Sequence, residues 1–276
     1  MNYYCLVAGL PDLQKEDSKG FLSLEELREE ISGQLTPSDV DLLNLLYAKF
    51  DNANFLKYLK NRDSVLDPLG VLKSDDWEEL VLLMQEVEQP KDERLLPYIV
   101  EYYNFIQAED HFAKEIAPED YLSGLYYAYA MQVDNQFMKD WFEFNLNLNN
   151  LLTAIFCRKH SIQPEKLIIG KNEISSNLKT SHARDFGIGN LFEYADEVFK
   201  IAEERDLLER EKKIDALKWF WLEEHTFFHY FSIEKILAYT LKVEMLQRWK
   251  MLSFESGSEI FRNLLVSLKE GIEIEV

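Results

Sequence analysis

The sequence predicts an all-α protein, and three observations lead to that prediction. Glycine and proline are scarce, at 10 and 7 of 276 residues. Strand hairpins and βα connections depend on the turn chemistry of these residues, so their scarcity favours few, long elements. Apolar residues recur at helical spacing in most segments, and several segments open with a helix N-cap pattern. We therefore expect bundled helices rather than a sheet.

Helix start signals give the expected elements in order. Ser23 with Glu26 forms a capping-box pattern, which predicts a helix that stops near Gly33. Residues 3–8 form an apolar run too short to tell a strand from a buried helix. Residues 51–54 carry oxygen ligands without the spacing of a calcium loop, so we interpret them as a turn. Further helices are expected to start at Thr36-Pro37, at Ser74 and, after a connector, at Gln163-Pro164-Glu165, and residues 55–59 form a turn or a short helix. The other expected helices cover residues 24–32, 96–106, 118–131, 141–160, 190–224 (one or two helices), 232–248 and 256–269.

The stretch at 170–189 is the longest polar, small-residue segment, and its periodicity fades. A loop of this length in a compact domain is usually functional or mobile. We expect one helical body over 1–276, with possible sub-units at 1–89, 90–189 and 190–276 and a hinge or loop near 170–189.

Composition restricts the function classes. Thirty basic residues face 50 acidic ones, a net charge of −20. Nucleic-acid binding relies on Lys and Arg neutralising phosphates, so this charge argues against it, and docking on anionic lipid is disfavoured for the same reason. The acidic surface favours either simple solvation or a basic partner protein. Two cysteines and no signal-peptide pattern indicate a reduced, cytoplasmic setting, and no apolar run approaches the ~20 residues of a membrane span.

Candidate chemistry is sparse. His225 and His229 have the i, i+4 spacing of two zinc ligands on one helix face. The protease signature needs Glu directly after the first His, and Thr226 stands there, so two core histidines are the favoured alternative. Cys157 is close to Arg158 and Lys159, which could lower its pKa, but a small core residue is the simpler interpretation. We find no nucleophile–base pair and predict no catalytic residue and no cofactor.

Three polar pairs at i, i+3 spacing recur on expected helices. They are Asp41/Asn44, Asn147/Asn150 and Glu244/Gln247, separated by 106 and 97 residues. Residues at this spacing share one helix face, and asparagine inside a helix is unfavourable by propensity. Asn147 and Asn150 therefore predict buried polar contacts that hold helices in register, and the period near 100 residues predicts about three related helical units. Coincidence is the alternative, because the pattern is loose.

The second and third of these segments resemble the C-type stalk subunits of V/A-type ATP synthases, known as d-type subunits in eukaryotic V-type ATPases. That family repeats helices reading acidic-x-x-Asn-Leu, then a basic helix end, a short loop and a new helix start. Here Asn147 to Leu151 is followed by Arg158-Lys159, and the segment 236–247 is similar to the family's C-terminal helix. The N-terminal segment 3–13 also looks like a family of unknown function encoded beside bacterial V-type ATPase genes. The sequence departs from the family pattern at two positions: Asn147 stands where the family has an acidic residue, and Gln247 stands where it has Asn.

The resemblance implies a non-catalytic, funnel- or wedge-shaped coupling subunit of the central stalk. It implies protein partners in the shaft and the membrane rotor ring, and a place peripheral to the membrane, with a role in ion transport. Two further hypotheses stay open: a helical metalloenzyme that uses His225, His229 and carboxylates, and a generic helical interaction scaffold.

Overall fold

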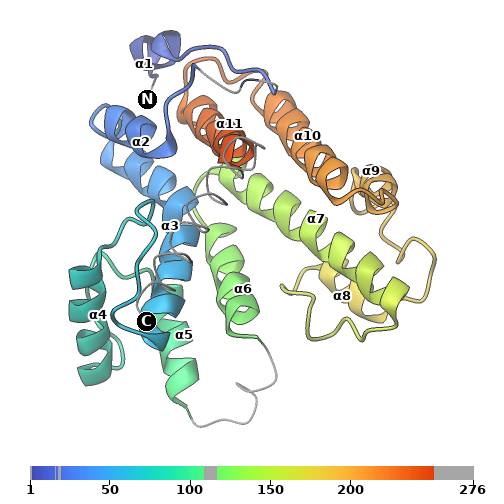
Figure 1. Ribbon diagram of the computed structural model, residues 1–276, viewed down its shortest axis with the longest axis horizontal. Helices are drawn as coiled ribbons and strands as arrows, with labels where there is room; N and C mark the ends of the chain where they lie inside the picture. The colour runs from blue at the N-terminus through green and yellow to red at the C-terminus, as the bar shows by residue number, and fades with distance from the viewer. Residues whose placement is uncertain (1, 16, 18–19, 109–116, 252–276) are drawn as a thin grey trace, which may run out of the picture. The chain divides into compact units, whose positions relative to one another are not determined.

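In the computed structural model, which describes residues 2–15, 17, 20–108 and 117–251, all regular secondary structure is helical. The all-α prediction is therefore confirmed for this part of the chain. The helices are α1 (Tyr4–Gly9), α2 (Leu24–Ser32), α3 (Pro37–Lys60), α4 (Ser74–Glu86), α5 (Pro97–Gln107), α6 (Pro118–Ala130), α7 (Gln136–His160), α8 (Glu173–Thr180), α9 (Ala195–Ala202), α10 (Leu207–His225) and α11 (Ile233–Met251) (Figure 1). None of the described helices is long and apolar enough to cross a membrane.

The chain divides into two compact units. Unit 1 combines residues 1–36 with 215–276, and unit 2 is the continuous stretch 37–214. The boundary therefore falls at the start of α3 and within α10. These boundaries differ from the segments predicted at 1–89, 90–189 and 190–276, and that threefold division stays a prediction.

Unit 2 is organised around two long helices, α3 and α7, of 24 and 25 residues. Helix α3 packs on α4 and α6, and α7 packs on α6, α8 and α9, so α6 lies between the two long helices (Figure 1). Its core is rich in aromatic side chains. Phe55 of α3 stacks on Trp77 of α4 with ring centroids 4.8 Å apart, and both side chains are fully buried.

Unit 1 packs α2 against α11. Helix α2 begins as the sequence predicts: the Ser23 hydroxyl accepts a hydrogen bond from the Glu26 N–H, and the Glu26 carboxylate accepts one from the Ser23 N–H. Leu27 and Ile31 of α2 and Ile236 and Leu237 of α11 are completely buried. The apolar run at 3–8, which the sequence alone does not assign to a strand or a helix, is helical, as α1.

Three local predictions were wrong. Residues 51–54 are not a turn but lie inside α3, which runs on to Lys60. The expected helix start at 163–165 is only a turn, because the chain reaches Gly170, at φ +82°, within a few residues. The expected loop at 170–189 contains α8, which Asn172 caps by accepting from the Ser175 N–H. The predicted helix at 256–269 lies outside the described residues.

Candidate functional site

Asn150 of α7 makes two hydrogen bonds to a single loop residue. Its Nδ2–H donates to the Ile169 carbonyl at 2.7 Å, and its Oδ1 accepts from the Ile169 N–H at 3.1 Å. The side chain is 2% exposed, and the Nδ2 group also lies 3.2 Å from the Ser175 hydroxyl. One buried amide thus satisfies both backbone groups of a loop residue that has no helical partner. We call this arrangement an amide clamp.

Asn147, one turn earlier on α7, supports the same loop. Its Oδ1 accepts from the Asn172 side-chain amide at 2.8 Å, and Asn172 is the N-cap of α8. The pair therefore joins the middle of α7 to the start of α8. The predicted buried polar role of Asn147 and Asn150 is what the geometry shows.

A second amide clamp lies in α3, at Asn54. Its Oδ1 accepts from the Asp67 N–H at 2.7 Å, and its Nδ2–H donates to the Asp67 carbonyl at 2.9 Å. Asn54 is 0% exposed. Asp51, one turn earlier, accepts from the N–H groups of Val71 and Leu72 just before α4. Asp51/Asn54 therefore does in α3 what Asn147/Asn150 does in α7.

A glycine lies beside each clamp. A Cβ on Gly70 would stand 2.5 Å from Asn54 Nδ2, and a Cβ on Gly170 would stand 2.9 Å from Leu146 of α7. Only a residue without a side chain lets the loop backbone come this close to the long helix. The two long helices thus share the same sequence of parts: polar pair, clamped loop, glycine and new helix.

Asp41 and Asn44, the predicted first pair, have a different environment. They lie nearer the start of α3, with Asp41 exposed and Asn44 half-buried, and both line a groove. The contacts seen at Asn147/Asn150 are found on this helix at Asp51/Asn54, ten residues after the predicted pair. The signal that points to Asn54 is spacing: Asn54, Asn150 and Gln247 are 96 and 97 positions apart.

The third pair, Glu244/Gln247, lies on α11 in unit 1. The Gln247 Oε1 accepts from the Leu24 N–H at 2.7 Å and so helps to cap the start of α2. Glu244 is half-buried beside the fully buried Val243. This contact joins two helices of unit 1, whereas the amide clamps hold loops of unit 2.

His225 and His229 do not share a helix face. Helix α10 ends at His225, whose ring stacks on Trp221 at 3.8 Å and whose Nδ1 lies 2.9 Å from the Trp221 carbonyl. His229 follows in the turn and lies 3.5 Å from Glu234. The i, i+4 argument therefore fails, because the residues after 225 leave the helix. Among the described residues, no group of three or more His, Cys, Asp or Glu side chains is arranged to hold a metal ion.

Cys157 lies in the core of unit 2, almost fully buried. Burial raises the pKa of its thiol, and Glu165 adds to the rise. The neighbouring Arg158 does not activate it, because the guanidinium bonds the carbonyls of Ser181 and Arg184 instead. The suggestion that nearby cations lower the pKa of Cys157 was wrong.

The turn between α10 and α11, residues 226–232, exposes aromatic side chains to solvent. Phe228 is 82% exposed, Phe227 is 64% exposed, and Tyr230 is also exposed. We call this segment the aromatic turn. Large apolar side chains gathered on a surface mark an interaction site more often than chance exposure does.

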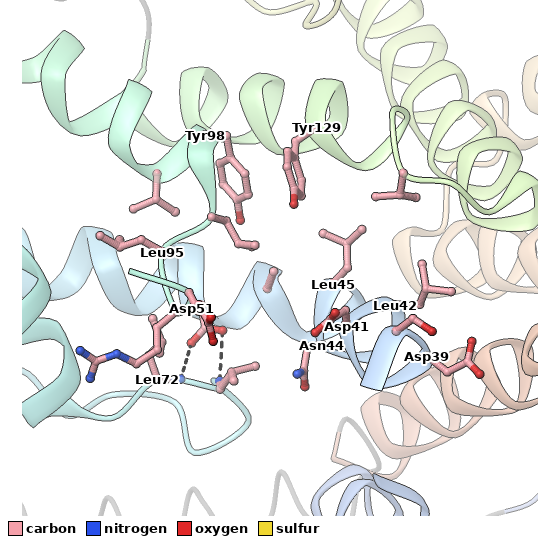
Figure 2. A pocket seen from close by; sticks show the side chains of 18 of the residues that line it. Asp39, Asp41, Leu42, Asn44, Leu45, Asp51, Leu72, Leu95, Tyr98 and Tyr129 are labelled. Carbon is pink, nitrogen blue, oxygen red and sulfur yellow. Dashed lines mark hydrogen bonds between the residues drawn. The ribbon is translucent and has the colours of Figure 1, made fainter. Parts of the chain in front are cut away.

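A groove of about 930 Å³ lies within unit 2, between α3, α5 and the end of α6. Tyr98 of α5 and Tyr129 of α6 point across it toward α3, whose Leu42, Leu45 and Asp51 also line the groove (Figure 2). The Tyr98 hydroxyl donates to the Asn52 Oδ1 at 2.7 Å, and burial raises the pKa of Tyr98. Figure 2 also shows the two hydrogen bonds of Asp51 at one end of the groove.

The groove is acidic. Exposed carboxylates on three separate segments line it: Asp41 on α3, Glu93 before α5 and Asp134 after α6. Arg94 is the one basic residue among the described residues that line it. Its guanidinium already pairs with Asp76, Glu79 and Asp92 at 2.8–3.0 Å, and the side-chain hydrogen bonds to Asp92 and Glu79 raise its pKa.

Comparison with known proteins places the chain in a family. A search of the curated proteins and a search of the solved structures each gave no match. A family model described as "Protein of unknown function (DUF2764)" matches residues 1–272. Because the match covers nearly the whole chain, this protein belongs to the DUF2764 family.

Proposed function

We propose that the protein is a non-catalytic coupling subunit of a V/A-type ATPase, which links the rotor shaft to the membrane rotor ring during ion transport. The observation that carries the proposal is the repeated pair on the long helices, Asp51/Asn54 and Asn147/Asn150, with its clamped loop and new helix. The proposal places the chain in the cytoplasm, peripheral to the membrane through the complex.

The corrected first pair strengthens the resemblance to the C-type stalk subunits. Asp51-Asn52-Ala53-Asn54 follows the acidic-x-x-Asn outline, and Lys57 and Lys60 provide the basic helix end before the loop and α4. The pair predicted at Asp41/Asn44 lacks this continuation. Two of the three copies now have the same parts in the same order.

The clamps also suit a part that transmits torque. A coupling body has to pass force from one partner to the other without yielding at its loops. Each clamp fixes a loop through two part-buried hydrogen bonds from a buried amide, and a buried amide left unpaired costs about 1–3 kcal/mol. Loop movement that breaks a clamp therefore raises the free energy of the protein, which favours a stiff connection between α3 and α4 and between α7 and α8.

The surface fits a protein that binds other proteins. Interfaces are enriched in aromatic residues and depleted of charge at their centre, and the aromatic turn has this composition. A net charge of −20 complements basic patches on a partner and would accelerate association. Both features support membership of a protein complex.

The test is a pull-down with an affinity-tagged chain from cells that carry both this protein and a V-type ATPase. Recovery of shaft and rotor-ring subunits is expected. The double variant Phe227→Ser with Phe228→Ser should lose them while keeping its fold, because both side chains are exposed. Leu82→Ser, an exposed apolar residue of α4, is the matched control and should retain them.

Two results would count against the proposal. Recovery of no rotor component would contradict it, and recovery of unrelated proteins alone would favour the scaffold hypothesis. Elemental analysis of protein purified without chelators addresses the metalloenzyme hypothesis, since stoichiometric zinc or iron would support that hypothesis instead.

A further inference from the structure

We propose that the groove between α3, α5 and the end of α6 binds a basic amphipathic segment of another protein, with its apolar side chains between the helices and its Lys or Arg side chains on Asp41, Glu93 and Asp134. This inference concerns one binding surface and does not rest on the proposed function.

The interior of the groove is apolar and of a size that suits side chains. Leu42, Leu45 and Tyr129 line it together with Tyr98 and Ile99. A volume of about 930 Å³ is at the upper end of the range for ligand pockets, about 300–1,000 Å³. Such a space accommodates two or three large apolar side chains of one segment.

The rim determines the sign of the partner's charge. Asp41, Glu93 and Asp134 come from three different segments, so a cationic segment that lies along the groove meets carboxylates at several points. Arg94 does not cancel them, because its charge is shared among Asp76, Glu79 and Asp92. An acidic segment would be repelled, and so would a nucleic-acid backbone.

Trp77 provides a spectroscopic reporter in the wall of the groove. Its indole N–H is, among the described residues, the one buried side-chain polar atom without a hydrogen-bond partner. Trp77 is 1% exposed and lines the groove. The indole Nε1 is enclosed within the wall of the groove, so a bound segment that alters the packing of this wall changes the surroundings of the N–H.

The test uses the isolated protein and a short, blocked helical peptide of leucine and lysine as the probe. Its affinity is measured by titration calorimetry, and the indole N–H signals of the tryptophans are followed by NMR. Trp77→Phe identifies the Trp77 signal and preserves the ring stacked on Phe55. We expect binding that weakens with salt and a shift of the Trp77 signal on binding.

The carboxylates are tested together. The triple variant Asp41→Asn, Glu93→Gln, Asp134→Asn should bind the peptide about tenfold more weakly, since each exposed ion pair contributes modestly. The control carries Glu143→Gln, Glu193→Gln and Glu197→Gln, all exposed and outside the groove. It removes the same number of charges and should bind like the unmodified protein.

Three outcomes would overturn the inference. The first is a loss of charge selectivity: the unmodified protein binds a leucine–glutamate peptide of the same length as tightly as the lysine peptide, or the variant at Asp41, Glu93 and Asp134 binds the lysine peptide as tightly as the unmodified protein does. The second is an equal shift of the Trp77 signal by spermidine, which would indicate a small polycation instead of a protein segment. The third is no binding of the lysine peptide at all. A failed pull-down from the ATPase alters none of these results, so the two proposals fail separately.

Discussion

Asn150 and Ile169 form a closed pair: one side-chain amide of α7 satisfies both the N–H and the carbonyl of a single loop residue. The two distances, 2.7 and 3.1 Å, are those of ordinary hydrogen bonds. Asn54 and Asp67 repeat the pair on α3. In both cases the asparagine side chain is buried, whereas the loop residue that it holds is half-buried.

Asn150→Leu should lower the free energy of unfolding by about 1–3 kcal/mol, because the Ile169 N–H loses its acceptor and the Ile169 carbonyl keeps only the Ser175 hydroxyl as a donor. Denaturant unfolding measures this loss. Asn149→Leu, on the exposed side of the same turn, is the control and should change stability by less than about 1 kcal/mol. Equal losses for the two variants would mean that the clamp is not the cause.

Gly70→Ala should destabilise the protein by about 1–3 kcal/mol, because the new methyl group would stand 2.5 Å from Asn54 Nδ2 and 2.9 Å from Asp51 Oδ1. Gly33→Ala is the matched control, since no atom lies within 4 Å of its Cβ and φ is −69°. It should be neutral or stabilise by up to about 1 kcal/mol. The measurement is the midpoint of thermal unfolding, which should fall for Gly70→Ala and stay the same or rise for Gly33→Ala.

Gln247→Ala should cost about 0.5–1.5 kcal/mol, because the Leu24 N–H at the start of α2 loses its acceptor. Gln247→Glu keeps an acceptor oxygen at that position and should recover most of the loss. Hydrogen exchange of the α2 amides offers a local measurement. A loss that glutamate does not recover would assign the effect to packing.

The two cysteines should react at very different rates with a thiol reagent. Cys5 is exposed, whereas burial hides Cys157 and raises the pKa of its thiol. We expect one fast-reacting thiol in the native protein and a second only in denaturant, because the thiolate is the reactive form. In Cys5→Ser the fast phase should disappear. A fast phase that persists in this variant would show that Cys157 is accessible.

Stability should fall as pH rises above about 10, the ordinary pKa of tyrosine. Burial, with Glu30 and Asp12, raises the pKa of Tyr239 to about 12, and burial also raises the pKa of Tyr127. Below pH 10 both the folded and the unfolded chain hold these protons, so stability is unaffected there. Above it the unfolded chain loses them first, which favours unfolding.

The measurement is the free energy of unfolding between neutral pH and about pH 11, together with tyrosinate absorbance. Tyr239→Phe removes one raised pKa and should make the decline with pH less steep. An unchanged slope in this variant would rule out Tyr239 as a contributor.

Local signals predicted the helices well, and non-local contacts explain the failures. Ser23 and Glu26 fix the start of α2 through bonds within one turn, so their pattern was sufficient. Residues 51–54 resemble a turn because they are polar. Their hydrogen-bond partners lie at residues 67–72, in the loop that follows α3. Burying these polar side chains inside a helix is favourable only when that loop has folded over them and formed the hydrogen bonds.

The same reasoning separates the predicted site residues. Asn147 and Asn150 stood out because leucines surround them, which favoured buried polar contacts over coincidence. The groove could not be foreseen, since its carboxylates come from three segments that the fold brings together. The prediction that His225 and His229 share a helix face was wrong because a spacing of four residues places two side chains on one face only if the helix continues through both. Helix α10 ends at His225.

The division into units has a consequence for the order in which the protein can fold during synthesis. Unit 2 is continuous, and its clamps close over 13 and 19 residues, so each can form soon after its loop leaves the ribosome. The first segment of the chain cannot complete its native contacts until the end of α11 has been synthesised. Tyr3 bonds the carbonyl of Phe231, and Leu24 bonds Gln247, so α1 and α2 emerge first and dock only after α11 has been made.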